Sequence, residues 1–308
     1  EALTGEANKP DMDIDELMGS LKLGDSLTPE QRELLRSRLR QRLHYFSKTR
    51  IGSIHGVQHD IDTPALDADP TLTCFVKARV ASGEAAEAAK KTFDDLNEKG
   101  LLRRPSTRRF GAPIVVVKKP KGDGEGGDAY RVAIDFRLLN KYTTKDAYPL
   151  PDPRESLAAV ADADWLSALD ASSAFHQITI NPAHAEKTSV NWGHDYRYYT
   201  TMPFGLTNAT ATYQRMIDAV LASVLWHPAR SEKDRACVVC FVDDVLCYTK
   251  GTFEQHVEDL MGTLDLLGGS GMILKPSKCY IGMREVEFVG HVTGGGSCLL
   301  YTSDAADE

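Results

Sequence analysis

The stretch CVVCFVDDVLCY (residues 237–248) contains two short apolar runs separated by a pair of aspartates. Apolar, β-branched runs on either side of a short polar break are typical of two strands joined by a tight turn. We therefore predict strands at 238–242 and 245–248, with Asp243 and Asp244 at the turn. Two adjacent carboxylates repel each other unless a cation lies between them, although aspartate also suits turns for purely conformational reasons. The pair alone leaves both a metal site and an ordinary turn open.

A third carboxylate, Asp170, ends the apolar run WLSAL (residues 165–169). If strands 166–170 and 238–248 are neighbours in one sheet, three carboxylates converge at one edge and offer the hard oxygen ligands that Mg²⁺ prefers. Two such ions suit phosphoryl transfer, because one activates the attacking hydroxyl and the other neutralises the leaving group. The chain contains no GxSxG, GxxxxGK[ST] or HExxH motif that would support another chemistry.

Charge is unevenly distributed along the 308 residues, whose formal net charge is −8. Residues 99–145 contain 12 Lys and Arg against 4 Asp and Glu, a local charge of +8, so the remainder carries −16. This asymmetry suggests a basic face for a polyanion, although a merely solvated charged region would look the same. No apolar run approaches the ~18 residues of a membrane span, and the acidic N-terminus lacks a signal-peptide core.

Periodicity predicts four helices and several strands around these carboxylates. Thr28-Pro-Glu-Gln31 is a helix start of the capping-box type, and Gly100 is a suitable helix stop. Residues 1–27 are expected to be a flexible leader and residues 48–72 a linker. The predicted helices are 28–46, 83–99, 209–225 and 253–267, and the further strands are 113–117, 130–136 and 287–292. Strands and helices mix without strict βαβ alternation, which favours an α+β fold.

Several motifs together resemble the reverse transcriptases of gypsy-type LTR retrotransposons. FVDD (241–244) is similar to the YxDD signature of that family, with Phe in place of Tyr. The other similar segments, in family order, are RVAIDFRLLNK (131–141), YPLP (148–151), LDASSAFHQI (169–178), MPFGLTNA (202–209), TYQR (212–215) and FVGH (288–291). The resemblance covers about residues 28–293, so the chain is identified as a member of this family, the fingers and palm of a Pol polyprotein.

The resemblance implies a right-hand polymerase with a ferredoxin-like palm, an inserted fingers subdomain and no thumb. The implied domains are a leader and linker with one helix (1–72), fingers (73–150 and 179–208), palm (151–178 and 209–293) and a non-native-looking tail (294–308). Residues 298–308, CLLYTSDAADE, look like the translation of a sequencing-library adaptor, and we expect them to be disordered and functionless. A thumb, a connection and a ribonuclease H domain are expected downstream in the natural reading frame.

The resemblance also implies roles for particular residues. Asp170, Asp243 and Asp244, with the Ala171 carbonyl, would hold two Mg²⁺ ions, with Mn²⁺ as an alternative. The implied nucleotide-binding residues are Lys119, Arg131, Phe175, Phe204 and Gly205, with Phe175 as the gate that rejects a 2′-hydroxyl. The implied primer grip is Phe288, Val289, Gly290 and His291. Lys278 falls near the later palm motif, where a proton-donor role is a hypothesis.

The implied partners are an RNA or DNA template with its primer, deoxynucleoside triphosphates and the downstream domains, but no membrane. The implied location is intracellular, in the cytoplasm or a virus-like particle, rather than secreted. Two other functions stay open: a palm relic that binds nucleic acid without catalysis, and a metal-dependent nuclease or phosphatase. The family pattern is also interrupted by the glycine-rich insertion GDGEGG (122–127) and by polar residues 226–234.

Overall fold

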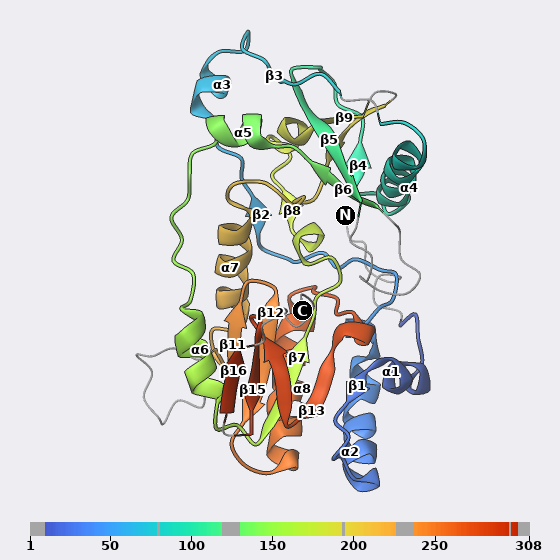
Figure 1. Cartoon of the computed structure of the whole chain (residues 1–308), viewed down its shortest axis with the longest axis vertical. Coiled ribbons are helices and arrows are strands. Elements are labelled where there is room, and N and C mark those ends of the chain that lie inside the picture. Colours follow the sequence, from blue (N-terminus) through green and yellow to red (C-terminus); the bar gives the residue numbers. More distant parts are fainter. Residues whose placement is uncertain are drawn as a thin grey trace, which may run out of the picture. The chain divides into compact units, whose positions relative to one another are not determined.

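The computed structural model describes residues 10–78, 81–118, 130–192, 195–225 and 237–295, and the strand 297–300 (Figure 1). The chain forms two compact units. Unit 1 comprises residues 1–55, 148–174 and 213–308, and unit 2 comprises residues 56–147 and 175–212. Among the described residues, no helix is both long and apolar enough to cross a bilayer.

Unit 1 is built on a five-stranded sheet with the order β1-β13-β7-β12-β11. Its helices and strands are α1 (Ile14–Ser20), β1 (Lys22–Leu23), α2 (Pro29–Leu39), η1 (Arg40–Tyr45), α6 (Pro153–Val160), β7 (Trp165–Leu169), α7 (Ala209–Val220, which continues from unit 2), β11 (Val238–Phe241), β12 (Asp244–Thr249), α8 (Phe253–Gly269), η4 (Pro276–Lys278), β13 (Tyr280–Met283), β14 (Glu285–Phe288), β15 (His291–Gly294) and β16 (Ser297–Leu300).

The connections of this sheet are those of a ferredoxin-like fold. The chain order β7-α7-β11-β12-α8-β13 is βαββαβ, and these four strands lie in the spatial order fourth, first, third, second. All contacts among the four are antiparallel, whereas β1 joins the edge of β13 in parallel. The strand order follows from the two helical crossovers, which carry the chain past a neighbouring strand.

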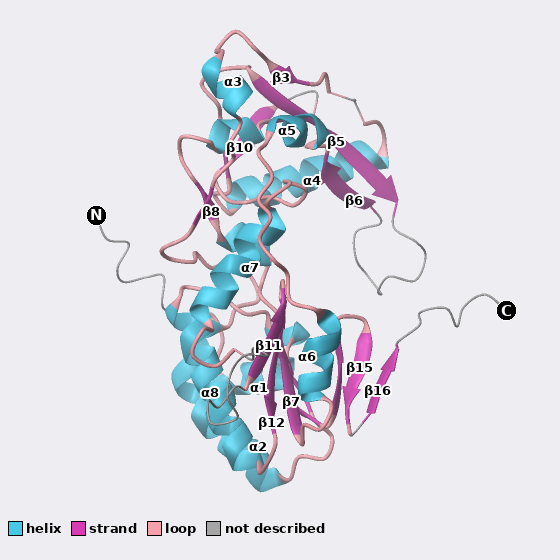
Figure 2. Ribbon diagram, turned by 90° about the vertical axis from the view of Figure 1, so that its left-hand side faces the viewer, coloured by secondary structure: helices cyan, strands magenta, loops and turns pink. Residues whose placement is uncertain are grey.

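Alternating side chains give the sheet two apolar faces, and helices cover both. Leu166, Val239 and Leu246 point to one face, where they pack with Leu157 of α6 and Phe288 of β14. The opposite face is covered by α8, which buries the apolar residues predicted for it, Val257, Leu260, Met261 and Leu264. Figure 2 shows α8 with α2 on one side of the strands and α6 on the other. The core of unit 1 thus fixes the strand ends at which the carboxylates lie.

Unit 2 contains a sheet of order β3-β5-β9-β10-β4, with β6 paired to β5, and a separate β2–β8 pair. Its elements are β2 (Gln58–His59), α3 (Pro64–Ala68), β3 (Cys74–Phe75), α4 (Glu84–Glu98), β4 (Leu102–Arg103), β5 (Phe110–Lys118), β6 (Tyr130–Ile134), α5 (Arg137–Tyr142), η2 (Ala174–Gln177, beginning at the last residue of unit 1), β8 (Thr179–Ile180), η3 (Ala185–Thr188), β9 (Val190–Asn191) and β10 (Tyr196–Tyr199). The predicted hairpin is present as β5–β6, and its glycine-rich tip lies outside the described residues.

The N-terminal region differs from the sequence prediction. The flexible leader is wrong for residues 14–23, because α1 is capped by Asp13 and β1 pairs with β13. Leu17 and Leu21 are buried, which explains why a polar, acidic segment still docks on the sheet. The capping box of Thr28 and Gln31 is confirmed, but the helix that it starts changes to a 3₁₀ helix from residue 40 onward.

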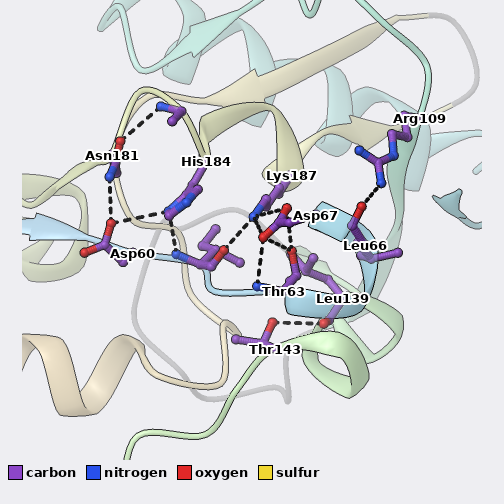
Figure 3. Close-up of polar contacts among 12 residues, drawn as sticks. Asp60, Thr63, Leu66, Asp67, Arg109, Leu139, Thr143, Asn181, His184 and Lys187 are labelled. Carbon is purple, nitrogen blue, oxygen red and sulfur yellow. Dashed lines mark hydrogen bonds and ion pairs between the residues drawn. The ribbon is translucent and has the colours of Figure 1, made fainter. Parts of the chain in front are cut away.

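The expected linker is also wrong from residue 56 onward, because this segment packs within unit 2 (Figure 3). Lys187, which is 7% exposed, donates to Asp67 and to the carbonyl of Ile61 at 2.9 and 2.8 Å. Arg109 donates to the carbonyls of Leu66, Asp69 and Leu72. These polar contacts replace the apolar periodicity that would have marked the segment as structured.

The C-terminal end of unit 1 also differs. The single strand expected at 287–292 is a hairpin, β14–β15, with Phe288 opposite His291. Residues 297–300 form β16 and pair with β15, so the prediction of a disordered segment is wrong for 298–300. Residues 301–308 lie outside the described residues. The preceding residues Gly294 and Gly295 have positive φ, 120° and 60°, and β16 pairs along the edge of β15.

Candidate active site

The register of the central strands brings two of the three predicted carboxylates to adjacent positions. Leu169, the last residue of β7, lies opposite Val245 of β12, and the strands are antiparallel. One step further along this register, Asp170 faces Asp244. Cross-strand neighbours have Cβ atoms about 5 Å apart. The third carboxylate, Asp243, lies in the turn that joins β11 to β12. Strand pairing alone therefore places Asp170 opposite Asp244, with Asp243 in the adjoining turn.

The turn before Asp244 has a strained backbone. Phe241 pairs with Asp244, so Val242 and Asp243 form a two-residue turn, and Val242 has a φ of 55°. A β-branched residue rarely adopts this conformation, and such strain is common at functional sites. The Val242 N–H donates to the Gln214 side-chain oxygen at 2.7 Å, and Gln214 is fully buried on α7. Helix α7 thus fixes the hairpin tip that carries the carboxylates.

The electrostatics of the site disfavour ionisation of Asp170 and Asp244. Partial burial raises the pKa of Asp170, and the nearby charge of Asp243 raises it further, against a lowering by Lys278. Partial burial also raises the pKa of Asp244, followed by the charges of Asp243 and Asp170. Carboxylates that repel one another at a strand edge gain stability when a cation is placed among them.

Carboxylate oxygens are the ligands that a hard divalent cation prefers. In this structure, two of the carboxylates accept hydrogen bonds from other groups of the protein. Lys278 donates to Asp170 Oδ2 at 3.1 Å, and Asp244 accepts a hydrogen bond from the Val289 backbone N–H. No group of three or more His, Cys, Asp or Glu side chains in the described ranges has metal-binding geometry. Ala171, whose carbonyl is the fourth expected ligand, is 9% exposed and forms a bridge with Leu274.

The predicted primer-grip residues lie beside Asp244. Val289 and Gly290 form the two-residue turn of the β14–β15 hairpin, and both have positive φ, 49° and 70°. Such a turn has the twist that hairpins prefer, but Val is a rare residue in it. The hairpin lines one side of a groove of about 750 Å³ in unit 1, whose other walls include Asp170 and Lys278. His291 Nδ1 lies 2.8 Å from the Val289 carbonyl oxygen, to which it donates as Nδ1–H.

The predicted nucleotide-binding residues that the structure describes belong to unit 2. Arg131 lies on β6 opposite Val117 and is exposed. Phe175 is buried against Phe204, with ring centroids 4.9 Å apart, whereas Phe204 is 56% exposed. Gly205 has a φ of 91°, which only glycine adopts readily.

The Gly205 carbonyl accepts from the Asn140 side chain at 2.9 Å, and this pair connects the MPFGLTNA segment to α5. Lys119 lies outside the described residues. The structure thus brings Phe175 and Phe204 together within unit 2 and places Arg131 on the fingers hairpin.

Two polar residues of the site were missed by the sequence interpretation. Gln214 was quoted only as part of the TYQR motif, and its function as the acceptor for Val242 depends on the turn geometry. Lys22, which lines the groove, was assigned to the flexible leader. A lysine two residues before a glycine carries no periodic signal, so the sequence offered nothing that would have marked it.

Comparison with known families agrees with this geometry. The profile of the reverse transcriptase (RNA-dependent DNA polymerase) family matches residues 117–293, more than half of the chain. The chain belongs to the reverse transcriptase family. We refer to unit 1, with the ferredoxin-like sheet and the FVDD hairpin, as the palm, and to unit 2, with the β5–β6 hairpin, as the fingers.

Curated relatives are Pol polyproteins of retrotransposons. The chain is 32% identical over 204 residues to the Pol polyprotein of transposon opus from Drosophila melanogaster, covering 66% of this chain and 19% of that protein. It is 32% identical over 193 residues to that of transposon gypsy from the same species, covering 63% of this chain and 18% of the relative. The chain thus spans about a fifth of the length of the curated relatives that it matches.

Solved structures support the fold. The chain is similar to a foamy viral protease-reverse transcriptase in complex with an RNA/DNA hybrid, with a TM-score of 0.76, 20% identity, and coverage of 94% of this chain and 36% of that one. The same TM-score and identity are found for the complex with double-stranded DNA, where 55% of that chain is covered. The polymerase fold with palm and fingers that was expected from the sequence is confirmed.

Proposed function

We propose that this chain is the polymerase part of an RNA-directed DNA polymerase, which adds deoxynucleotides to a primer 3′-hydroxyl on an RNA or DNA template. The observation that carries the proposal is the register of β7 and β12, which aligns Asp170 with Asp244 beside the turn residue Asp243. Membership of the reverse transcriptase family supports the same reaction. The retained carboxylates favour catalysis over a relic that only binds nucleic acid.

Asp170, Asp243 and Asp244 would hold the cations, with the Ala171 carbonyl as a further ligand. When bound, two Mg²⁺ ions would acidify the primer hydroxyl and neutralise charge on the departing pyrophosphate. The protein's own contribution is to position the oxygens: Gln214 fixes the Val242–Asp243 turn, and the β7–β12 pairing fixes Asp170 and Asp244. Rigid placement of the ligands matters because most of the charge stabilisation comes from groups arranged in advance.

Nucleic acid and nucleotides are the proposed partners. Arg131 on the fingers hairpin offers a planar fork for phosphate, and we propose the same function for Lys119. Phe175, Phe204 and Gly205 would line the nucleotide site, and residues 288–291 would support the primer. The similar foamy viral proteins are described in complex with an RNA/DNA hybrid and with double-stranded DNA. By relation to retrotransposon Pol polyproteins, we also propose action in the cytoplasm or in a virus-like particle.

Primer extension by the chain, fused to a downstream thumb from a related Pol polyprotein, tests the reaction. Asp170→Asn and Asp243→Asn should each lower extension by about a thousandfold or more, which corresponds to roughly 4 kcal/mol in the barrier. Asp162→Asn is the matched control, because Asp162 is a palm aspartate that pairs with Lys250 outside the groove. The control should extend at the wild-type rate.

Thermal melting with and without Mg²⁺ or Mn²⁺ provides a readout that does not need activity. The ions should raise the melting temperature of the wild type and of Asp162→Asn. The rise should be smaller for Asp243→Asn, which lacks one of the proposed ligands. Near-native extension by either site variant would refute the assignment of the carboxylates. Degradation of the template–primer in place of extension would favour the nuclease alternative, and binding without either reaction would favour the relic.

A further inference from the structure

The N-terminal segment supplies one wall of the palm groove. β1 pairs in parallel with β13, with Lys22 opposite Tyr280, and both residues line the groove together with Asp170, Lys278 and the β14–β15 hairpin. Figure 1 shows β1 at the edge of the sheet beside β13. The segment is therefore a fixed part of the palm rather than a leader that happens to lie nearby.

The Lys22 side chain is held in a defined position although it is exposed. Its ammonium donates to the Tyr280 hydroxyl at 2.6 Å and lies 4.3 Å from the centre of the Tyr280 ring. Among the residues that the structure describes, Lys22 has no carboxylate within ion-pair distance. An ammonium has three donors, so the Tyr280 contact leaves two for an acceptor in the groove.

The charges around the groove indicate where an anion would lie. Four charged residues line the groove besides the aspartates: Lys22 on β1, Lys278 on η4, and Glu285 and Glu287 on β14. A polyanion passing through the groove is repelled by the glutamates and attracted to the two lysines. Of the two lysines that line the groove, Lys278 already donates to Asp170, whereas Lys22 has no ion pair with a carboxylate of the described residues.

We propose that Lys22, positioned by Tyr280, binds a backbone phosphate of the primer strand as it leaves the catalytic carboxylates. The inference rests on the proposed polymerase function and assigns a substrate contact to the N-terminal segment. Tyr280 acts as the positioning residue, because its ring and hydroxyl restrict the flexible lysine stem before the phosphate arrives. Restriction of this kind lowers the entropy lost on binding.

Salt-dependent binding of a primer–template duplex to the chain tests the proposal. Lys22→Met keeps the apolar stem over Tyr280 and removes the charge. It should weaken binding about tenfold at low salt, the scale of one charged hydrogen bond. It should also reduce the slope of log affinity against log salt by about 0.9, the value for one phosphate contact. Lys22→Arg should restore the slope, and Lys250→Met, a lysine outside the groove, should leave it unchanged.

Tyr280→Phe distinguishes phosphate binding from a purely structural function. If Lys22 binds phosphate, Tyr280→Phe keeps the wild-type salt slope and weakens binding only slightly. Equal loss of melting temperature in Lys22→Met and Tyr280→Phe, with the salt slope unchanged in both, would show that the pair only fastens β1 and would overturn the proposal. If the wild type binds and extends, and Lys22→Met has the same salt slope and affinity, the Lys22 proposal is overturned. The proposed polymerase function is unaffected by that result. Failure of the wild-type chain fused to the thumb to extend a primer would refute the function itself.

Discussion

Partly buried carboxylates have pKa values shifted in opposite directions in the palm and in the fingers. In the palm, burial and mutual repulsion raise the pKa of Asp170 and Asp244. In the fingers, burial also raises the pKa of Asp67. Hydrogen bonds from Lys187 and Thr63 and the Lys187 charge lower this pKa by more than burial raises it, so the net shift is downward. Asp170 also has a lysine partner, Lys278, but this contact does not offset the effects of burial and repulsion on its pKa. The contacts of Asp67 more than offset its burial. The ionised form of Asp67 is therefore stabilised by the protein itself, whereas the palm carboxylates gain stability when a cation is placed among them.

Removing charge from the two regions should produce opposite effects on stability. Asp67→Asn leaves the buried Lys187 ammonium without its carboxylate and should destabilise the chain by about 2–3 kcal/mol, less than a fully buried pair because Asp67 is partly exposed. Lys187→Met should cost less, since the remaining carboxylate reaches solvent. Asp170→Asn should leave the melting temperature unchanged or raise it, because it removes the repulsion between Asp170 and the neighbouring aspartates. Urea unfolding of the three variants measures the contrast, and a stability loss in Asp170→Asn as large as in Asp67→Asn would contradict it.

A buried histidine between α8 and the palm sheet makes the stability of the palm depend on pH. His256 of α8 is fully buried, and its Nε2 and Nδ1 lie 2.7 Å from the Ser167 hydroxyl and 3.0 Å from the Thr249 hydroxyl. Thr249 donates to Asp259, and Ser167 accepts from the Gly282 N–H. One neutral tautomer satisfies the whole network: Nδ1–H donates to Thr249, and Nε2 accepts from Ser167. Burial accordingly lowers the pKa of His256 to about 4.

The stability contributed by neutral His256 should decline in acid. Because the folded-state pKa of about 4 lies below the ordinary 6.5, the contribution is complete above about pH 6.5 and is lost as the pH falls toward 4. The total loss is on the order of 3 kcal/mol. His256→Gln should be less stable than the wild type at pH 7, with the gap closing by pH 4, whereas His55→Gln, at an exposed histidine, should follow the wild type. A gap that is constant across this range would show that His256 titrates normally.

The sequence predicted the catalytic strands more accurately than the segments that surround them. Asp170, Asp243 and Asp244 could be placed because each ends or interrupts an apolar run, and their convergence required only that these runs be neighbours. β1 could not be predicted, since a two-residue strand has no periodicity and forms only because β13 offers an edge. The segment around Asp67 was missed for a similar reason: its anchors are Lys187 and Arg109, distant in the chain.

The positive φ of Val242 and Val289 also could not be predicted, because valine is a residue that disfavours it. Each lies at a hairpin turn beside Asp244. Local propensity is overridden at these two turns by contacts made elsewhere: Gln214 accepts from Val242 N–H, and Asp244 accepts from Val289 N–H. Sequence patterns thus locate the chemistry, whereas the strain that positions it depends on tertiary contacts.

The smallest effect that we predict concerns the fingers residue Phe175, which follows Asp170 by five positions. Phe175→Val removes aromatic volume from the contact with Phe204 and should admit ribonucleotides beside the 2′ position. Discrimination between deoxynucleotides and ribonucleotides should fall by about 1–3 kcal/mol, the range for resizing a pocket. Phe93→Val is a matched control, because Phe93 is also a buried fingers residue and is stacked on Trp192. Both variants should lose stability through the cavity, but only Phe175→Val should change the ratio of kcat/KM for the two sugars. An unchanged ratio would show that Phe175 is a core residue of the fingers and does not select the sugar.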